Sequence, residues 1–157
     1  MKENDNRNCG TCNECCMGWL EGEAYGHKFS PEIPCSFLSN NQCSIYSKRP
    51  ECCKSFSCEW LLDKNLPNDF RPDFTKVIPV RYQFKDMPYY VLVGNYTNIN
   101  EKIYQWMLNE YLQNNTFFVY YTQGFRQIKG SESFVEFARQ LYPKYYTIFL
   151  QGSGLEK

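Results

Sequence analysis

The sequence predicts an α+β protein, in which a small cysteine-rich N-terminal module with short helices precedes an antiparallel hairpin and further helices. Two observations in the 157 residues lead to this prediction. All nine cysteines lie in the first 58 residues, whereas 21 of the 28 aromatic residues lie in the last 95. We therefore expect a flexible tail over residues 1–8, a cysteine-bearing module over 9–62, and an aromatic-rich segment over 63–157 that packs on the module in one compact domain.

The aromatic-rich segment contains the pattern of a β-hairpin. Residues 75–84 and 88–96 are rich in β-branched and aromatic side chains, and a polar pair at 85–86 lies between them. Pro79 lacks a backbone N–H, so the first strand should lie at a sheet edge or contain a bulge. The polar stretch 63–73 contains two prolines and should be a loop that joins the two parts.

Helical periodicity follows the hairpin. Apolar residues recur at intervals of three and four over 100–113, which predicts an amphipathic helix. No basic patch surrounds the aromatic run 116–122, so we expect a core strand there and not a platform for stacking bases. Ser133 followed by Glu136 resembles a capping box and predicts a helix that ends before Pro143.

Composition and charge exclude several classes of protein. Lys and Arg number 17, as do Asp and Glu, so the formal net charge is zero and a strongly basic nucleic-acid binder is excluded. No apolar run approaches the ~18 residues of a membrane span, and no glycine-rich phosphate-binding motif occurs. The polar start lacks the apolar region of a secretory signal, so we expect a cytoplasmic protein without membrane association.

The cysteines carry the strongest functional signal. A C-x2-C-x2-C-C string is followed by two isolated cysteines, an adjacent pair and a final cysteine: Cys9, Cys12, Cys15, Cys16, Cys35, Cys43, Cys52, Cys53 and Cys58. Two residues between cysteines allow one turn to direct both sulfurs to one metal, and thiolates favour zinc, copper(I) and iron–sulfur clusters. An odd cysteine count without a secretory signal argues against a disulfide scaffold. The spacing therefore predicts a metal site that staples the module together.

Two features of the pattern leave the type and number of centres open. The first three cysteines match the opening of the bacterial ferredoxin motif C-x2-C-x2-C-x3-C-P, but Cys16 directly follows Cys15 and no proline follows. A zinc ribbon would need two C-x2-C knuckles, of which one is present. Adjacent cysteines direct their side chains differently, so either one of this pair is structural or two centres are present. Nine thiols would supply two four-sulfur sites with one thiol left over.

The full pattern resembles the CxxCxxCC, or YkgJ-like, cysteine-cluster family. The resemblance covers residues 9 to about 60, and rests on the four-cysteine string and on the C-x-I-Y-x2-R-P-x2-C motif from Cys43 to Cys53. Members are described as zinc- or iron-chelating proteins, some as iron–sulfur oxidoreductases, and flagellin lysine methylase looks like a larger relative. The resemblance implies a ligand set of Cys9, Cys12, Cys15, Cys16, Cys35, Cys43, Cys53 and Cys58. It leaves Cys52 as the spare thiol.

These observations favour an iron–sulfur protein, with zinc as the alternative. The ferredoxin-like opening, the number of thiols, the single histidine and a reducing compartment favour a [4Fe–4S] cluster, whereas zinc is common in structural cysteine sites. With a cluster, the protein would transfer electrons to a protein partner or serve as an accessory to an enzyme. With zinc, it would be an interaction module. A modifying enzyme is a further alternative, by analogy with the flagellin methylase alone.

Charged residues near the cysteines are expected to support the site and not to replace its ligands. His27, the single histidine, should lie in a solvated loop, because enough thiolates are present to hold a metal. Arg49 either lowers the negative charge of a cluster or pairs with Glu51 or Glu59.

Two further groups of side chains flank the cysteines. Tyr46, Phe56 and Trp60 should pack as core around the site. The acidic residues beside the cysteines, Glu14 among them, lack the close spacing of a hard-metal site and should form a solvated face.

Overall fold

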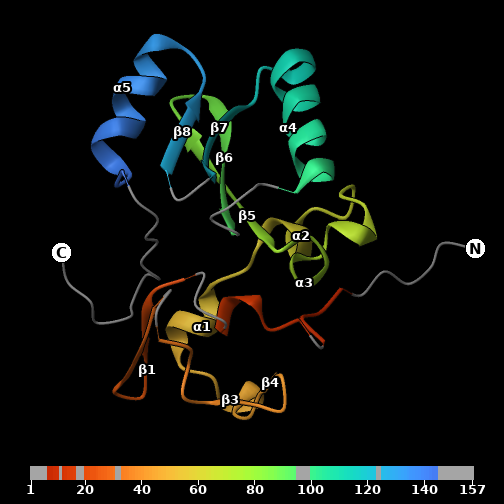
Figure 1. Cartoon of the computed structure of the whole chain (residues 1–157), viewed down its shortest axis with the longest axis vertical. Helices are drawn as coiled ribbons and strands as arrows, with labels where there is room; N and C mark the ends of the chain where they lie inside the picture. The colour runs from red at the N-terminus through yellow and green to blue at the C-terminus, as the bar shows by residue number, and fades with distance from the viewer. Residues whose placement is uncertain are drawn as a thin grey trace, which may run out of the picture.

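The chain folds into two parts (Figure 1). One part is a four-stranded sheet that lies between helices, and the other part bears the cysteines and consists of short hairpins and helices. The computed structural model describes residues 7–10, 12–16, 20–30, 33–94, 100–122 and 125–144. The prediction of a mixed α and β protein with an antiparallel hairpin is confirmed. The cysteine-bearing part also contains two hairpins that were not predicted. Its elements are η1 (Glu14–Cys16), β1 (Gly22–Ala24), β2 (His27–Phe29), β3 (Leu38–Ser39), β4 (Gln42–Cys43), η2 (Tyr46–Lys48), α1 (Glu51–Ser55) and α2 (Glu59–Leu62).

The second part is a mixed sheet with the strand order β5-β6-β7-β8. Strands β5 and β6 are antiparallel, as are β7 and β8, whereas β6 and β7 run parallel and are connected through α4. Strand β8 was not predicted, and two helical turns occupy the segment expected to be a loop. The elements are η3 (Asn68–Phe70), α3 (Pro72–Thr75), β5 (Val77–Phe84), β6 (Met87–Gly94), α4 (Glu101–Asn114), β7 (Phe117–Thr122), β8 (Phe125–Lys129) and α5 (Glu132–Leu141).

The hairpin of β5 and β6 follows its sequence prediction. Phe84 pairs with Met87 across the turn, in which Lys85 adopts a left-handed φ of 53°. Strand β5 lies at the edge of the sheet. A proline at an edge does not remove a hydrogen bond from the middle of a ladder, so Pro79 is accommodated there.

Helices α4 and α5 cover opposite faces of the sheet (Figure 1). Tyr89 and Tyr90 are neighbours in β6, so their side chains point to different faces. On one face, Trp106 of α4 meets the ring of Tyr90 edge-on, with the centroids 5.1 Å apart. On the other face, the ring of Phe134 of α5 lies 5.1 Å from that of Tyr89. Aromatic contacts of this kind bury large areas, and they fix the two helices on the sheet.

Side-chain caps begin both long helices. The Asn100 side chain accepts a hydrogen bond from the Lys102 backbone N–H and caps α4. The Ser131 hydroxyl accepts the backbone N–H of Phe134 at 3.3 Å and caps α5. The prediction of Ser133 as the cap is therefore wrong by two residues.

A partly buried ion pair and an arginine connect the start of the chain to the segments that lead into the sheet. Glu14 is 3% exposed, and its carboxylate accepts a hydrogen bond from Lys76 Nζ at 2.8 Å. The expectation that Glu14 is solvated is therefore wrong. The Arg7 guanidinium donates to the carbonyl oxygens of Trp60 and Leu66 at 2.8 and 2.6 Å. These contacts tie η1 and its preceding segment to the end of α2 and the beginning of β5.

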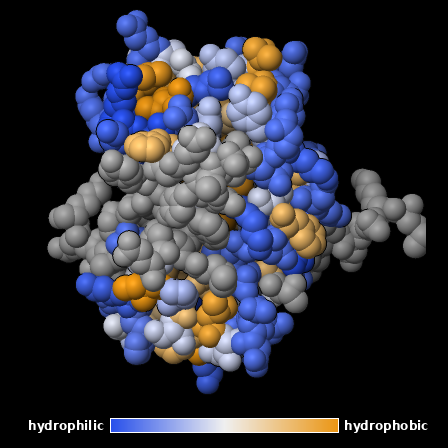
Figure 2. All heavy atoms as spheres, in the orientation of Figure 1, coloured by the Kyte–Doolittle hydropathy of each residue, from blue (hydrophilic) through white to orange (hydrophobic). Residues whose placement is uncertain are grey.

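Apolar side chains gather in the interior. One cluster of buried residues extends from the sheet to Trp60 and Cys58 in the cysteine-bearing part. On the face shown in Figure 2, the surface is mainly hydrophilic, and the exposed apolar residues form small separate areas. Among the described residues, no helix combines the length and the apolar character that crossing a membrane would require.

Candidate metal centre

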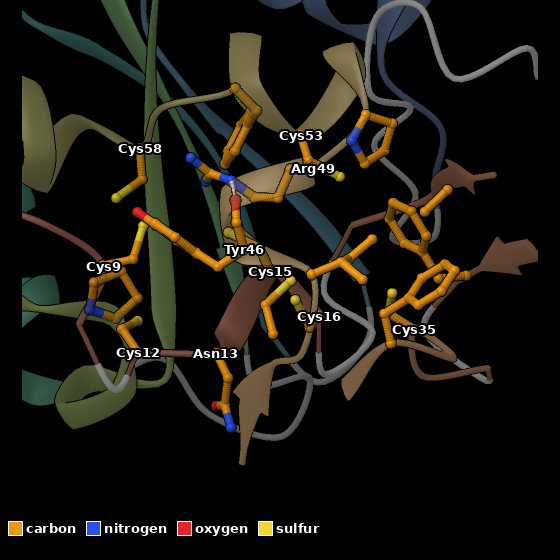
Figure 3. Close-up of a pocket in the computed structure, with 18 of the residues that line it drawn as sticks. Cys9, Cys12, Asn13, Cys15, Cys16, Cys35, Tyr46, Arg49, Cys53 and Cys58 are labelled. Atoms are coloured by element: carbon orange, nitrogen blue, oxygen red, sulfur yellow. Dashed lines mark hydrogen bonds between the residues drawn. The ribbon is translucent and has the colours of Figure 1, made fainter. Parts of the chain in front are cut away.

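A cavity of about 100 Å³ lies in the cysteine-bearing part, and eight of the nine cysteines line it (Figure 3). The eight are Cys9, Cys12, Cys15, Cys16, Cys35, Cys43, Cys53 and Cys58. They are the residues that the family resemblance implied as ligands. Apolar side chains, including Phe29, Phe37 and Trp60, form much of the remaining wall.

Backbone hydrogen bonds position the first five of these thiols. The Cys12 N–H donates to the Cys9 carbonyl oxygen at 2.7 Å, which closes the turn that carries both side chains. Cys15 and Cys16 follow in the single turn of η1. The Cys35 N–H donates to the Cys16 carbonyl oxygen at 3.0 Å, so the chain before β3 is held beside η1.

The last three thiols come from the ends of short elements. Cys43 ends β4, Cys53 lies in the first turn of α1, and Cys58 is the residue that precedes α2. The Leu61 N–H donates to the Cys58 carbonyl oxygen at 3.0 Å, which places this thiol at the start of the helix. Separate pieces of local backbone structure therefore bring these thiols to one volume.

Cys52 packs against strand β1 and does not line the cavity. Cys52 is 2% exposed, and its thiol donates to the Glu23 carbonyl oxygen at 3.3 Å. The Cys53 sulfur lies 3.8 Å from that of Cys52. One member of the adjacent pair therefore serves the packing of α1 on β1, and the other faces the cavity.

Burial favours the protonated form of most of the shifted thiols. It raises the pKa of Cys58 to about 11 and that of Cys53 to about 12. Burial also raises the pKa of Cys15 well above its ordinary value, and the nearby charge of Cys58 adds to this effect. Removing a thiolate from water and placing it near other thiolates both disfavour the charged form.

Some contacts act in the opposite direction and favour a thiolate. A hydrogen bond from the Cys16 thiol lowers the pKa of Cys35 to about 6. Burial raises the pKa of Cys12 overall, and a hydrogen bond from the Glu14 backbone lowers it in part. The charge of Arg71, which is held by two 2.6 Å hydrogen bonds to Asp73, also lowers this pKa, but less than the charge of Asp73 raises it. The sequence did not indicate Arg71, because it lies in the predicted loop and far along the chain from Cys12.

Tyr46 and Arg49 form an exposed side of the cavity. Tyr46 is 43% exposed, so it is not the core residue that was expected. Its hydroxyl forms a hydrogen bond with the Cys9 thiol, which raises the pKa of Tyr46. The Arg49 guanidinium lies 3.9 Å from the Tyr46 ring centroid, and its Nε donates to the Tyr46 carbonyl oxygen. Within the described residues no ion pair joins Arg49 to Glu51 or Glu59, so its charge remains beside the thiols.

One buried donor in the cavity wall lacks a partner. Trp60 is 6% exposed, and its indole N–H makes no hydrogen bond within the described part of the chain. Such a donor costs about 1–3 kcal/mol, so an acceptor bound within its reach would offset that cost. His27, by contrast, is exposed and lies outside the cavity, where its ring packs 5.5 Å from that of Phe37.

The donors at the cavity are those of a soft-metal site. None of the described lining residues carries a carboxylate or an imidazole, and thiolates are the ligands that zinc and iron–sulfur clusters accept. Over the described residues, no three His, Cys, Asp or Glu side chains are arranged so that they could hold one ion. The thiols therefore surround the cavity without meeting at one point.

Comparisons with known proteins add no family to this description. No family model matches the chain, and no curated protein or solved structure is significantly similar to it. The chemistry of the cavity therefore follows from its own residues.

Proposed function

We propose that this protein carries an iron–sulfur cluster of the [4Fe–4S] type, bound by cysteine thiolates of the cavity, and serves in electron transfer or as a cluster-bearing accessory to an enzyme. The observation that carries the proposal is the gathering of eight of nine cysteines around one cavity of about 100 Å³. Single buried cysteines often act as small apolar residues, as Cys52 does here. Packing of that kind does not account for eight thiols around one volume.

The donor chemistry supports a cluster over other ligands. A [4Fe–4S] cluster takes four thiolates, and the C-x2-C-x2-C opening matches that of bacterial ferredoxins. The unpaired N–H of Trp60 suits a site that offers sulfur acceptors, since hydrogen bonds to the sulfurs tune such clusters. Zinc also binds four thiolates, so the metal content has to be measured.

Binding would be coupled to local ordering of the thiols. The thiols surround the cavity without a ready ion site, and burial favours their protonated form. Ligation requires them to lose protons and to close on the metal. A bound cluster supplies one-electron redox chemistry. The chain provides the surroundings of the cluster: Phe29 and Phe37 limit access of water, and the charge of Arg49 opposes the negative charge of the thiolates.

An absorption spectrum of protein purified without oxygen, with iron, sulfide and zinc measured on the same sample, tests the proposal. We expect brown protein, a broad band near ~400 nm, and iron and sulfide in equal amounts. Colourless protein that contains zinc would contradict the cluster and indicate a structural zinc site. Protein that binds neither would overturn a metal function altogether.

The adjacent cysteines of α1 offer a matched pair of variants. Cys53→Ser removes a cavity thiol and should lower the metal content. Cys52→Ser retains a donor for the Glu23 carbonyl oxygen and changes no residue of the cavity, so it should leave the metal content unchanged. Loss of metal from C52S together with full retention in C53S would show that Cys52, and not Cys53, is the metal ligand.

A further inference from the structure

We infer that the side chain of Tyr46 is a cover over the thiol cavity, and that metal ions and small reagents reach the thiols past it. The inference rests on the proposed metal-binding function and deepens it, because it assigns the route by which that site is loaded and emptied. The cover is carried by η2, the single turn that begins at Tyr46.

Tyr46 lies between the cavity and the solvent. It lines the cavity and is 43% exposed. Among the other described lining residues only Gly10 is exposed, and it has no side chain, whereas the rest are buried or half-buried. Within the described wall, Tyr46 is therefore the side chain that separates the thiols from bulk water.

Three contacts hold the Tyr46 side chain in this position. Its hydroxyl forms a hydrogen bond with the Cys9 thiol, and Figure 3 shows the side chain directed toward Cys9. The Arg49 guanidinium lies 3.9 Å from the ring centroid, which is the geometry of a cation–π contact. Arg49 Nε also donates to the Tyr46 carbonyl oxygen at 2.9 Å. The residue is thus fixed at its hydroxyl, at its ring and at its backbone.

The turn that carries Tyr46 can move more easily than the inner wall of the cavity. None of the three residues of η2 is buried. The Lys48 N–H donates to the Ile45 carbonyl oxygen at 2.8 Å, and the Tyr25 hydroxyl donates to the Lys48 carbonyl oxygen. On the inner wall, Trp60 belongs to the buried apolar cluster. Segments with few buried contacts open at a lower free energy than the core does.

Opening of the cover would expose the thiols without unfolding the cavity. The backbone hydrogen bonds that position Cys12 and Cys35 do not involve η2, so they can persist when the Tyr46 side chain swings outward. Once Cys9 is a thiolate ligand, the Tyr46 hydroxyl donates to a charged acceptor, and such hydrogen bonds are stronger than neutral ones. The cover would therefore close more firmly over a loaded site than over free thiols.

Reaction of the thiols with N-ethylmaleimide, followed residue by residue with mass spectrometry on protein purified without oxygen, tests the cover. Tyr46→Ala removes the ring and the hydroxyl. It should speed the reaction of the cavity thiols by about tenfold or more, since loss of one hydrogen bond alone gives about three- to tenfold. Tyr46→Phe keeps the ring and should speed the reaction less. Tyr82→Ala is the matched control, because it removes a partly exposed tyrosine of β5 that lies outside the cavity, and it should leave the rate unchanged.

Cys52 provides an internal reference in the same experiment. It is buried, packs against β1 and does not line the cavity, so it should react slowly in every variant. Unchanged rates at the cavity thiols in Y46A would overturn the cover, and so would equal rates in Y46F and Y46A. If Cys52 reacts as fast as the cavity thiols in Y46A, the whole cysteine-bearing part has loosened and the cover is again overturned.

The metal content of the same samples separates this inference from the proposed function. Loaded Y46A should lose its metal to a chelator faster than the unchanged protein. Metal-free protein whose thiols still react faster in Y46A would overturn the cluster and keep the cover. A bound cluster whose removal does not depend on Tyr46 would keep the proposed function and overturn the cover. A metal content lowered equally in Y46F and Y46A would make the hydroxyl part of the site itself and overturn its role as a cover.

Discussion

Buried thiols hold their protons more tightly than exposed ones, and this sets the conditions under which the cavity can bind metal. Burial raises the pKa of Cys58 to about 11 and that of Cys53 to about 12. Cys35 differs, because its hydrogen bond from Cys16 lowers its pKa to about 6. Metal ligands must be thiolates, so an ion that enters the cavity has to displace protons from the thiols whose pKa is raised.

Binding of a metal should therefore release protons, and the affinity should rise with pH. Between about pH 6 and 8 the thiols of Cys53 and Cys58 are protonated, since their pKa values lie above this window. Each proton that the metal displaces then contributes about a tenfold gain in affinity per pH unit. Cys35 contributes little at the upper end of the window, because it is already deprotonated there.

Calorimetric titration of metal-free protein with zinc measures this release when it is repeated in two buffers of different ionisation enthalpy. Cys53→Ser should release fewer protons, and Cys52→Ser the same number as the unchanged protein. An affinity that does not vary with pH would show that the site holds preformed thiolates.

For single elements, the start of helix α5 shows how packing selects a cap. Ser133 and Glu136 have the spacing of a capping box, yet Ser131 supplies the cap. Phe134 is fully buried and lies against the Tyr89 ring, so the helix has to begin where this contact can form. Ser131 then has the extended backbone that a cap needs, whereas Ser133 lies inside the first turn.

Replacement of Ser131 by Ala should therefore destabilise the protein by about 1 kcal/mol, the usual cost of losing a helix cap. Ser133→Ala is the matched control and should change the free energy of unfolding by less than about 0.5 kcal/mol. Urea unfolding followed by circular dichroism measures both values. A larger loss for S133A than for S131A would make Ser133 the cap after all.

Across the whole molecule, the sheet and the cysteine-bearing part share one buried cluster but draw on different sources of stability. The sheet buries aromatic and branched side chains on both faces, between α4 and α5. The described elements of the cysteine-bearing part are short, and the longest, α1, has five residues. Elements of this length need tertiary support, which a metal in the cavity would supply.

Removal of the metal with a chelator should loosen residues 9–58 and leave the sheet folded. Backbone amides of β1, β2 and α1 should lose protection from hydrogen exchange, because these elements surround the cavity. Amides of β5–β8 should keep their protection, because the interior of the sheet is apolar and lies outside the cavity. Hydrogen exchange read by mass spectrometry, with and without chelator, measures both regions.

Two results would contradict this expectation. Equal protection of residues 9–58 with and without chelator would show that packing alone holds the cysteine-bearing part. Loss of protection throughout the sheet as well would show that the chain unfolds as one cooperative unit.

Features that depend on neighbours along the chain could be predicted from the amino-acid sequence. The predicted bounds lie close to the observed ones for the β5–β6 hairpin, helix α4 and strand β7. Local periodicity and turn residues indicate each of these elements. The edge position of Pro79 follows from its missing N–H. Cysteine spacing and the family resemblance singled out the eight thiols that line the cavity, although their ligation of a metal stays a prediction.

Contacts between residues that are distant along the chain could not be predicted in this way. Strand β8 has no strong pattern of its own and forms because β7 offers it an edge. Glu14 is buried, and its carboxylate is paired with Lys76, which lies between α3 and β5. Arg71 likewise comes to lie near Cys12, far from it along the chain. The gathering of thiols from residues 9–58 around one cavity is of the same kind. Such contacts depend on how whole elements pack, and short stretches of sequence carry information about local conformation only.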